Sequence, residues 1–175
     1  MRTRIVVYKR PGAVAPGLTA NGRDEPMNDA KMLKALESVC MGKRNQERLR
    51  CIFVKDGTAY ASDDYLLVAV QDAFTEPHGH DGLETVECVN GIWKFKPLDK
   101  GVYPMPGFEE CFSSHMNAKI ANAPVLFAPN FITKALRVFT AMDVKPDIRI
   151  SEHMSMIMMA SSTGYLVRVV LMGIR

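Results

Sequence analysis

Three features that define large classes of proteins are missing from this 175-residue sequence. Its formal net charge is only +3, so any affinity for a nucleic acid has to come from where the lysines and arginines lie rather than from the overall charge. No apolar run approaches the roughly 20 residues of a membrane-spanning helix, and the apolar run near the N-terminus is shorter than that of a signal peptide. We therefore expect a cytoplasmic protein that does not enter a membrane.

Cysteine patterns and catalytic motifs are missing as well. The four cysteines are widely spaced and form no Cys-x-x-Cys pair, so we expect reduced thiols that mostly pack. The sequence contains no phosphate-binding loop, nucleophile elbow, kinase motif or His-Glu-x-x-His motif. Adjacent carboxylates at 63–64 and 109–110 are most simply explained by turns and loops. The sequence thus predicts a protein that is not an enzyme and needs no cofactor.

Two groups of potential metal ligands remain. One contains His78, His80 and Asp81, and the other contains Cys111 with His115 four residues later. A structural zinc site needs four ligands in a tetrahedral arrangement, and this spacing fits no common zinc finger. We interpret these residues as ordinary loop residues, so a metal-dependent enzyme that uses the central segment is the weakest hypothesis.

A helix followed by three short strands is predicted twice along the chain. The apolar residues of 28–42 recur at helical spacing, and apolar runs separated by polar turns between 48 and 70 predict three strands. A second amphipathic helix is expected within 128–142, again followed by three strands, between 147 and 172. Between the two units, 83–98 is typical of a hairpin around an Asn-Gly turn, and the segment after it is expected to be mostly irregular.

Identical residues 100 positions apart suggest that the second unit duplicates the first. The matches are Lys34, Ala35, Leu36, Ser62, Tyr65, Leu66 and Val70 with Lys134, Ala135, Leu136, Ser162, Tyr165, Leu166 and Val170. At this offset Leu36 and Leu136 should face the core, as should Val39 and Phe139, while Lys34 and Lys134 should face outward. We therefore predict one domain over 1–175, with half-repeats at about 1–72 and 84–175 and an insertion at about 73–127.

Four stretches also carry a resemblance to a known family. In chain order they are DGTAYASDDYLLVAV, GVYPMPGFEECF, APNFITKALRVFTAM and YLVRVVLMGIR. They resemble segments of the DNA sliding clamps, and more specifically of one domain of the bacterial replicative clamp, the β subunit of DNA polymerase III. The resemblance covers most of the chain outside residues 9–27 and 73–100. It implies the α+β DNA clamp fold, a duplicated β-α-β-β-β unit with two helices packed on antiparallel sheets.

The resemblance implies contacts with double-stranded DNA. A clamp turns its helices toward the duplex, where lysine and arginine neutralise phosphates without reading the sequence. The residues expected to do so here are Lys31, Lys34, Lys43, Arg44, Arg48, Lys134 and Arg137. The alternative is that the polar side of each helix is charged only for solubility. A clamp subunit has three such domains and closes its ring as a dimer, so a ring of this chain needs about six copies.

The resemblance further implies a peptide-binding groove. In the family, the C-terminal strands and tail take a short apolar peptide from DNA polymerase and other replication proteins, and the residues expected here are Leu171, Met172 and Ile174. For the methionine-rich run at 155–159 we favour packing in the core. The leading hypothesis is a processivity or tethering factor in DNA replication or repair, homo-oligomeric if it forms a ring. The alternative is a stand-alone, phage or mobile-element type clamp-like module that binds replication proteins without encircling DNA.

Overall fold

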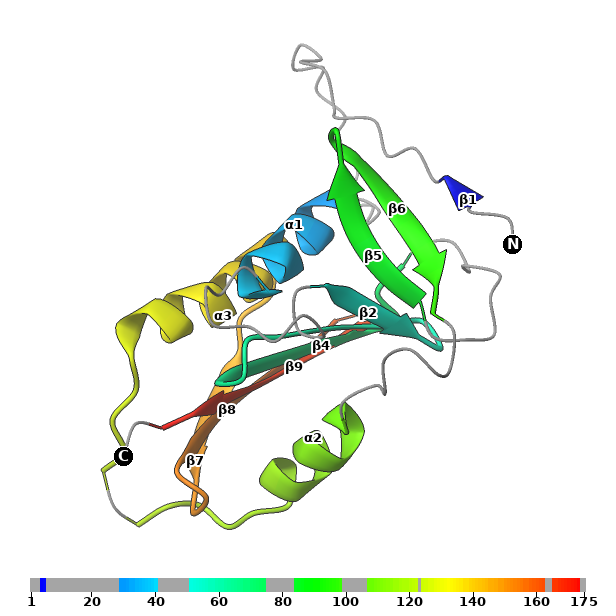
Figure 1. Ribbon diagram of the computed structural model, residues 1–175. Helices are drawn as coiled ribbons and strands as arrows, with labels where there is room; N and C mark the ends of the chain where they lie inside the picture. Colours follow the sequence, from blue (N-terminus) through cyan, green and yellow to red (C-terminus); the bar gives the residue numbers. More distant parts are fainter. Residues whose placement is uncertain are drawn as a thin grey trace.

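A computed structural model describes residues 4–5, 29–40, 51–74, 84–98, 107–122, 124–162 and 165–173 of the chain. These residues form an α+β fold with one antiparallel sheet and helices on both of its faces (Figure 1). The strands are β1 (Arg4–Ile5), β2 (Ile52–Lys55), β3 (Thr58–Ser62), β4 (Leu66–Gln71), β5 (Glu84–Val89), β6 (Ile92–Pro97), β7 (Asp147–Ser151), β8 (Ser155–Ser162) and β9 (Tyr165–Met172).

Two three-stranded units meet in the middle of the sheet. The nine strands run in the order β1-β6-β5-β2-β3-β4-β9-β8-β7, so β2-β3-β4 and β7-β8-β9 adjoin where β4 pairs with β9. Tight turns with positive φ at Asp56 and Gly57 and at Asn90 and Gly91 connect β2 to β3 and β5 to β6, as expected for short hairpins. The hairpin expected over 83–98 is confirmed by β5 and β6, and it extends the sheet beyond β2.

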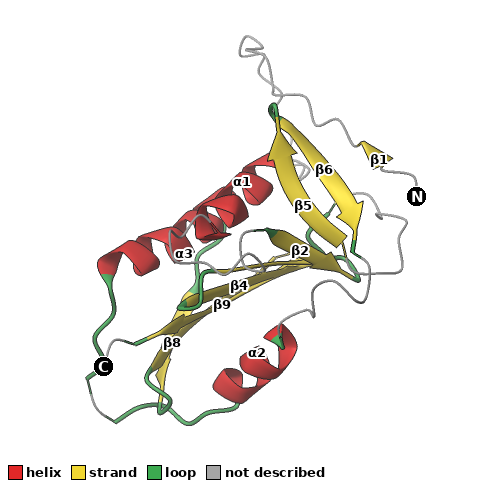
Figure 2. Ribbon diagram, in the orientation of Figure 1, coloured by secondary structure: helices red, strands yellow, loops and turns green. Residues whose placement is uncertain are grey.

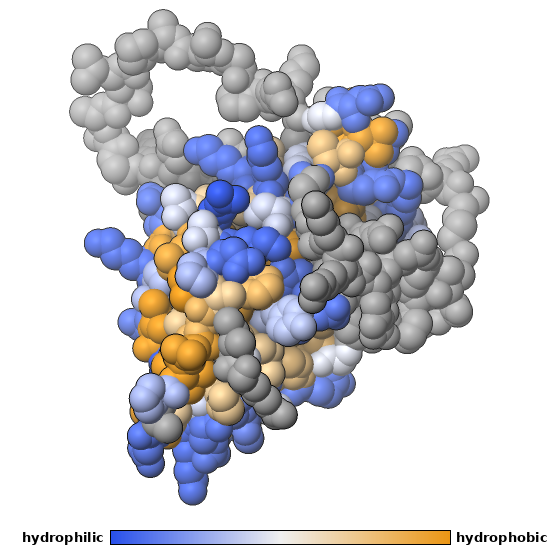
Figure 3. Space-filling view, turned by 60° about the vertical axis from the view of Figure 1, so that its left-hand side comes forward, coloured by the Kyte–Doolittle hydropathy of each residue, from blue (hydrophilic) through white to orange (hydrophobic). Residues whose placement is uncertain are grey.

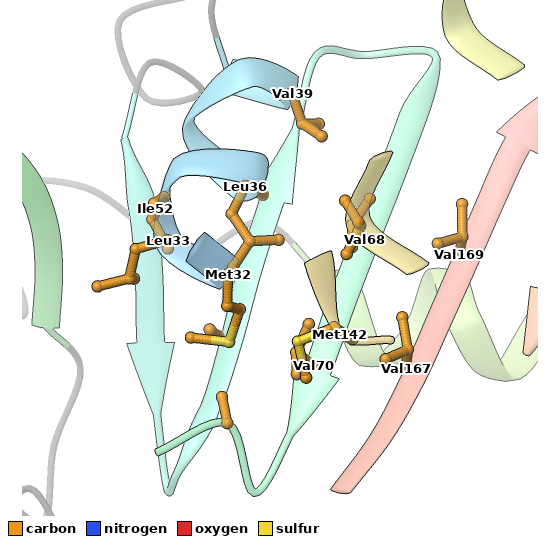
Figure 4. Close-up of a cluster of buried hydrophobic side chains, with 14 of the residues drawn as sticks. Met32, Leu33, Leu36, Val39, Ile52, Val68, Val70, Met142, Val167 and Val169 are labelled. Carbon is orange, nitrogen blue, oxygen red and sulfur yellow. The ribbon is translucent and has the colours of Figure 1, made fainter. Parts of the chain in front are cut away.

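The helices divide between the two faces of the sheet (Figure 2). Helices α1 (Asp29–Cys40) and α3 (Pro129–Ala141) lie side by side on one face, which we call the α1–α3 face, and α2 (Phe108–Met116) covers part of the other, the α2 face. Apolar side chains of α1 belong there to one buried cluster with residues of β2, β4 and β9 (Figure 4). No helix in the described part of the chain is long and apolar enough to cross a membrane.

Helix α2 lies in the segment that is expected to be mostly irregular, and the sequence-based prediction misses it. Phe108 and Phe112, one turn apart, are both buried against the sheet. Glu109 and Glu110 occupy the first turn, where negative charges interact favourably with the helix dipole and stabilise the helix. Glycine, proline and serine around this short segment hide its helical spacing in the sequence. Tertiary burial of the two phenylalanines therefore decides its structure.

The two units correspond at an offset of 99 residues rather than 100. The cross-strand pair Ala61 and Val68 in β3–β4 matches the pair Ala160 and Val167 in β8–β9, because 61 + 99 = 160 and 68 + 99 = 167. A shift of one residue turns a strand side chain to the opposite face. Val70 accordingly packs on the α1–α3 face, whereas Val170, its match at 100, packs on the α2 face.

The helices show the same shift. In α1 Leu36 and Val39 are fully buried, and in α3 the fully buried residues at the corresponding places are Ala135 and Val138, 99 positions later. Leu136 is 39% exposed, so the expectation that it faces the core with Leu36 is wrong. Phe139 is buried as expected, but its counterpart at the offset of 99 is Cys40 rather than Val39.

Candidate nucleic-acid interface

The outer surface of α1 and α3 carries three exposed cations. Lys31 and Lys34 lie one turn apart on α1, and Arg137 lies in the second half of α3. All three are exposed, as predicted, and the half-buried Glu37 is the nearby carboxylate on α1. Because the two helices pack against each other, these cations share one layer above the sheet. Lys43, Arg44 and Arg48, also predicted to contact DNA, lie outside the described residues.

Lys134 differs from these three cations, and the expectation that it faces outward is wrong. Its Nζ donates to Oδ2 of Asp63 at 2.7 Å, and the side chains of Lys134 and Asp63 are only 21% and 3% exposed. The same ammonium lies 5.6 Å from the centre of the Phe131 ring. Its charge is therefore compensated inside the protein, which makes Lys134 a poor contact for a phosphate.

Asp63 organises the turn between β3 and β4. Its Oδ1 accepts a hydrogen bond from the backbone N–H of Leu66 at 3.0 Å, while its own N–H donates to the Leu66 carbonyl at 3.1 Å. Asp64 follows with a φ of 70°, which aspartate tolerates better than most residues. The carboxylate pair at 63–64 thus lies in a turn, as expected, and Asp63 fixes this turn to α3 through Lys134.

Of the predicted peptide-binding residues, Leu171 and Met172 pack on opposite faces of the sheet. Leu171 is fully buried in β9 and packs into the core of the α1–α3 face, so it is closed to a peptide. Met172 is half-buried against the core of the α2 face, and its N–H donates to the Tyr65 carbonyl. Ile174 lies outside the described residues. Burial of Ile157 and Met158 agrees with core packing of the methionine-rich run.

Exposed apolar side chains instead surround the end of β9. Tyr65 is 50% exposed, Leu126 75% and Met154 39%, and we call these three residues the C-terminal apolar patch. Gly173 joins them, because its N–H donates to the Met154 carbonyl and a side chain at this position would collide with Val125. Figure 3 shows apolar surface on this side of the molecule. The patch uses residues that neighbour the predicted tail residues rather than those residues themselves.

A polar network on the α2 face was not predicted. Glu109 accepts a hydrogen bond from the Tyr60 hydroxyl at 2.6 Å and a two-pronged contact from Arg168 at 2.8 and 3.1 Å. These Arg168 hydrogen bonds lower the pKa of Glu109, and burial, followed by the bond to Glu109, raises the pKa of Tyr60 to about 12. The signal in the sequence was Arg168, the single charge within the apolar strand YLVRVVLM.

The described residues form no metal centre. Within them, no group of three His, Cys, Asp or Glu side chains could hold an ion, and His115 is engaged through Nδ1 with Ser155 Oγ at 2.8 Å. His78, His80 and Asp81 lie outside the described residues. A hollow of about 110 Å³ beside the end of α1 is lined by Glu37, Cys40, Ile52, Val86, Glu87, Cys88 and Trp93. Burial raises the pKa of the Cys40 thiol to about 12, which makes it unreactive.

Comparison of the sequence with known protein families and with curated proteins finds no match in either.

Proposed function

We propose that this protein is a non-enzymatic, clamp-like factor that holds double-stranded DNA during replication or repair. The observation that carries the proposal is the pair of helices α1 and α3, each preceding three strands, side by side on one face of a single sheet. This face carries the exposed cations Lys31, Lys34 and Arg137. The arrangement is the one that the resemblance to a clamp domain implies for a surface that faces a duplex.

The chemistry of this face suits the DNA backbone. Lysine and arginine on a helix surface neutralise phosphates and release counterions, which gives affinity that does not depend on sequence and falls steeply with salt. Thr133 and Thr140 direct their hydroxyls to carbonyl groups of α3 itself, so the charged side chains dominate the polar chemistry of this helix. The proposed ligand is therefore duplex DNA of any sequence.

Reversing the charge of Lys34 and Arg137 together tests this proposal. We expect the double variant Lys34→Glu/Arg137→Glu to bind a 30-bp duplex at least about tenfold more weakly at low salt, and the slope of log K against log salt to fall by about two. Fluorescence anisotropy of labelled DNA at several salt concentrations measures both quantities.

The double variant Lys119→Glu/Lys145→Glu is the matched control, because it makes the same change in net charge at two exposed lysines outside α1 and α3. This variant should keep the salt slope of the unmodified protein. Equal losses in the control and the Lys34→Glu/Arg137→Glu variant would show a general charge effect, and no DNA binding by the unmodified protein would rule out a clamp. Mass in solution, together with retention on circular against linear DNA, tells whether a closed ring forms.

The C-terminal apolar patch favours a second candidate function, a module that binds a replication protein without encircling DNA. Clustered exposed apolar residues mark interaction sites more often than isolated ones do. For this function we expect Leu126→Asp to weaken binding of a short apolar peptide from a DNA polymerase at least about tenfold, because it places a charge where apolar contact is needed. Isothermal titration calorimetry measures the affinity.

Ile120→Asp is the control for Leu126→Asp, since Ile120 is also exposed, at 70%, but is not part of the patch. Side-chain replacement is preferable to removing residues from 171 onward, because Leu171 belongs to the core. If both replacements leave peptide binding unchanged, the patch is not its site.

A further inference from the structure

Helix α2 is held on its face of the sheet by two buried rings. Phe108 stacks on Tyr60 with ring centres 5.5 Å apart and meets the edge of Phe53 at 6.0 Å. Phe112 is fully buried, and the Arg168 guanidinium lies 4.7 Å from its ring centre. A helix of nine residues is too short to be stable alone, so these contacts and the polar ones around them determine whether it forms.

Its polar contacts come from strands of both units. Glu109 in the first turn binds Tyr60 of β3 and Arg168 of β9, and Lys55 of β2 adds a favourable charge. The contact needs the ionised carboxylate, because a protonated Glu109 loses its charge pairing with Arg168 and one of its acceptor sites. Glu109 itself is about half exposed, with 49% of its side chain accessible, and Glu110, the other charged group in this turn, is exposed as well.

The last turn of α2 is attached through a second titratable group. His115 Nδ1 lies 2.8 Å from Ser155 Oγ of β8, and Ser155 in turn contacts Ser151 of β7. His153, in the turn between those strands, lies edge-on to His115 at 5.7 Å. Arg149 of β7 donates to the Met116 carbonyl, and Glu152 accepts from the Lys119 N–H just beyond the helix. Burial, followed by the neighbouring His153, lowers the pKa of His115.

We propose that α2 is an acid-released cover, which leaves its face of the sheet in acidic solution while α1, α3 and the sheet stay folded. The apolar residues uncovered would include Phe53, Leu67, Ile157 and Val170. The core of the α1–α3 face is built separately, by buried apolar side chains of α1, α3 and the strands. The proposal is independent of DNA binding.

The direction of the pH dependence follows from the two groups. The pKa of Glu109 is lowered mainly by Arg168, so its contribution is present above its ordinary value of 4.5 and is lost as the pH falls through the lowered value. The pKa of His115 is lowered by burial and then by His153, so stability also decreases as the pH falls below the ordinary value of 6.5. Both changes loosen α2 in acid.

The test follows two probes while the pH is lowered from 7 to 3. Binding of the dye anilinonaphthalene sulfonate reports the uncovered α2 face, and Trp93 emission reports the other core, where this side chain is buried. We expect dye binding to rise at least one pH unit before Trp93 emission changes. Coincident changes in the two probes would overturn the proposal, because the whole protein would then unfold together.

Glu109→Gln, which imitates the protonated carboxyl, should move the dye transition to higher pH by at least one unit. Its matched control is Glu110→Gln, one residue away and likewise exposed, which should leave the transition in place. Tyr60→Phe removes a single donor to Glu109 and should give a smaller shift in the same direction. This variant serves as the test if Glu109→Gln does not fold. Equal shifts in the Glu109 and Glu110 variants, or no shift in either Glu109→Gln or Tyr60→Phe, would overturn the proposal.

Discussion

Replacing Leu36 by alanine is expected to lower the free energy of unfolding by about 3 kcal/mol, whereas the same change at Leu136 should cost less than about 1 kcal/mol. Leu36 is fully buried between α1 and the sheet, so its removal leaves a cavity as well as losing apolar burial. Leu136 is 39% exposed, and its surroundings can be filled by water. Denaturant unfolding followed by Trp93 fluorescence measures both values.

This pair of variants also tests how the two units correspond. If the residues 100 positions apart were equivalent, the two leucines would occupy the same place and the two losses would be similar. A loss at Leu136 as large as the loss at Leu36 would therefore contradict the offset of 99. Ala135, the counterpart of Leu36 at that offset, is fully buried.

Replacing Lys134 by methionine is expected to destabilise the protein by about 3 kcal/mol, because it leaves the Asp63 carboxylate buried without its cation. The Asp63 side chain is only 3% exposed and also supports the β3–β4 turn, so water cannot readily replace the ammonium. Lys34→Met is the control, since Lys34 is exposed, and its cost should be within about 0.5 kcal/mol. Thermal and denaturant unfolding give the values.

The double variant Asp63→Asn/Lys134→Met distinguishes a broken pair from lost packing. It should recover a substantial part of the stability, because no buried charge remains. The salt slope of DNA binding should be unchanged in Lys134→Met and reduced in the Lys34 and Arg137 variants. A stable Lys134→Met protein with a reduced salt slope would instead show that Lys134 contacts the DNA phosphates.

The main elements could be predicted because they depend on local patterns. The helical spacing of Met32, Leu33 and Leu36 identifies α1, and the Asn90-Gly91 turn identifies the β5–β6 hairpin. Helix α2 could not be predicted in this way. Phe108 and Phe112 stabilise this helix only because they are buried against the sheet, and the local sequence does not show that burial.

Residue identity detects the repeat of the two units but does not fix which residues of the two units correspond. Common residues match by chance at many offsets, and a shift of one position still preserves the order of the elements. The same shift turns every strand side chain to the other face and rotates a helix position by about 100°. Identical residues also occur at the offset of 99, among them Val39, Ala61, Leu67 and Val68 with Val138, Ala160, Leu166 and Val167. Cross-strand pairing decides between the offsets.

At the candidate interface, some features follow from local sequence and others only from the tertiary fold. Exposure of Lys31, Lys34 and Arg137 follows from the apolar pattern of their own helices. The pairing of Lys134 with Asp63 joins residues 71 positions apart, and no local pattern contains it. The network of Glu109 with Tyr60 and Arg168 is likewise made by the fold.

The seam between β4 and β9 also has a consequence for how the chain folds. It pairs Leu66 with Leu171 and Gln71 with Leu166, so residues about a hundred positions apart must meet before the sheet is continuous. Closing so long a loop costs more conformational entropy than closing a local hairpin such as β2–β3. We therefore expect the hairpins to form early and the seam to close in the slowest step, with replacements at Val68 or Val169 acting mainly on the rate of that closure.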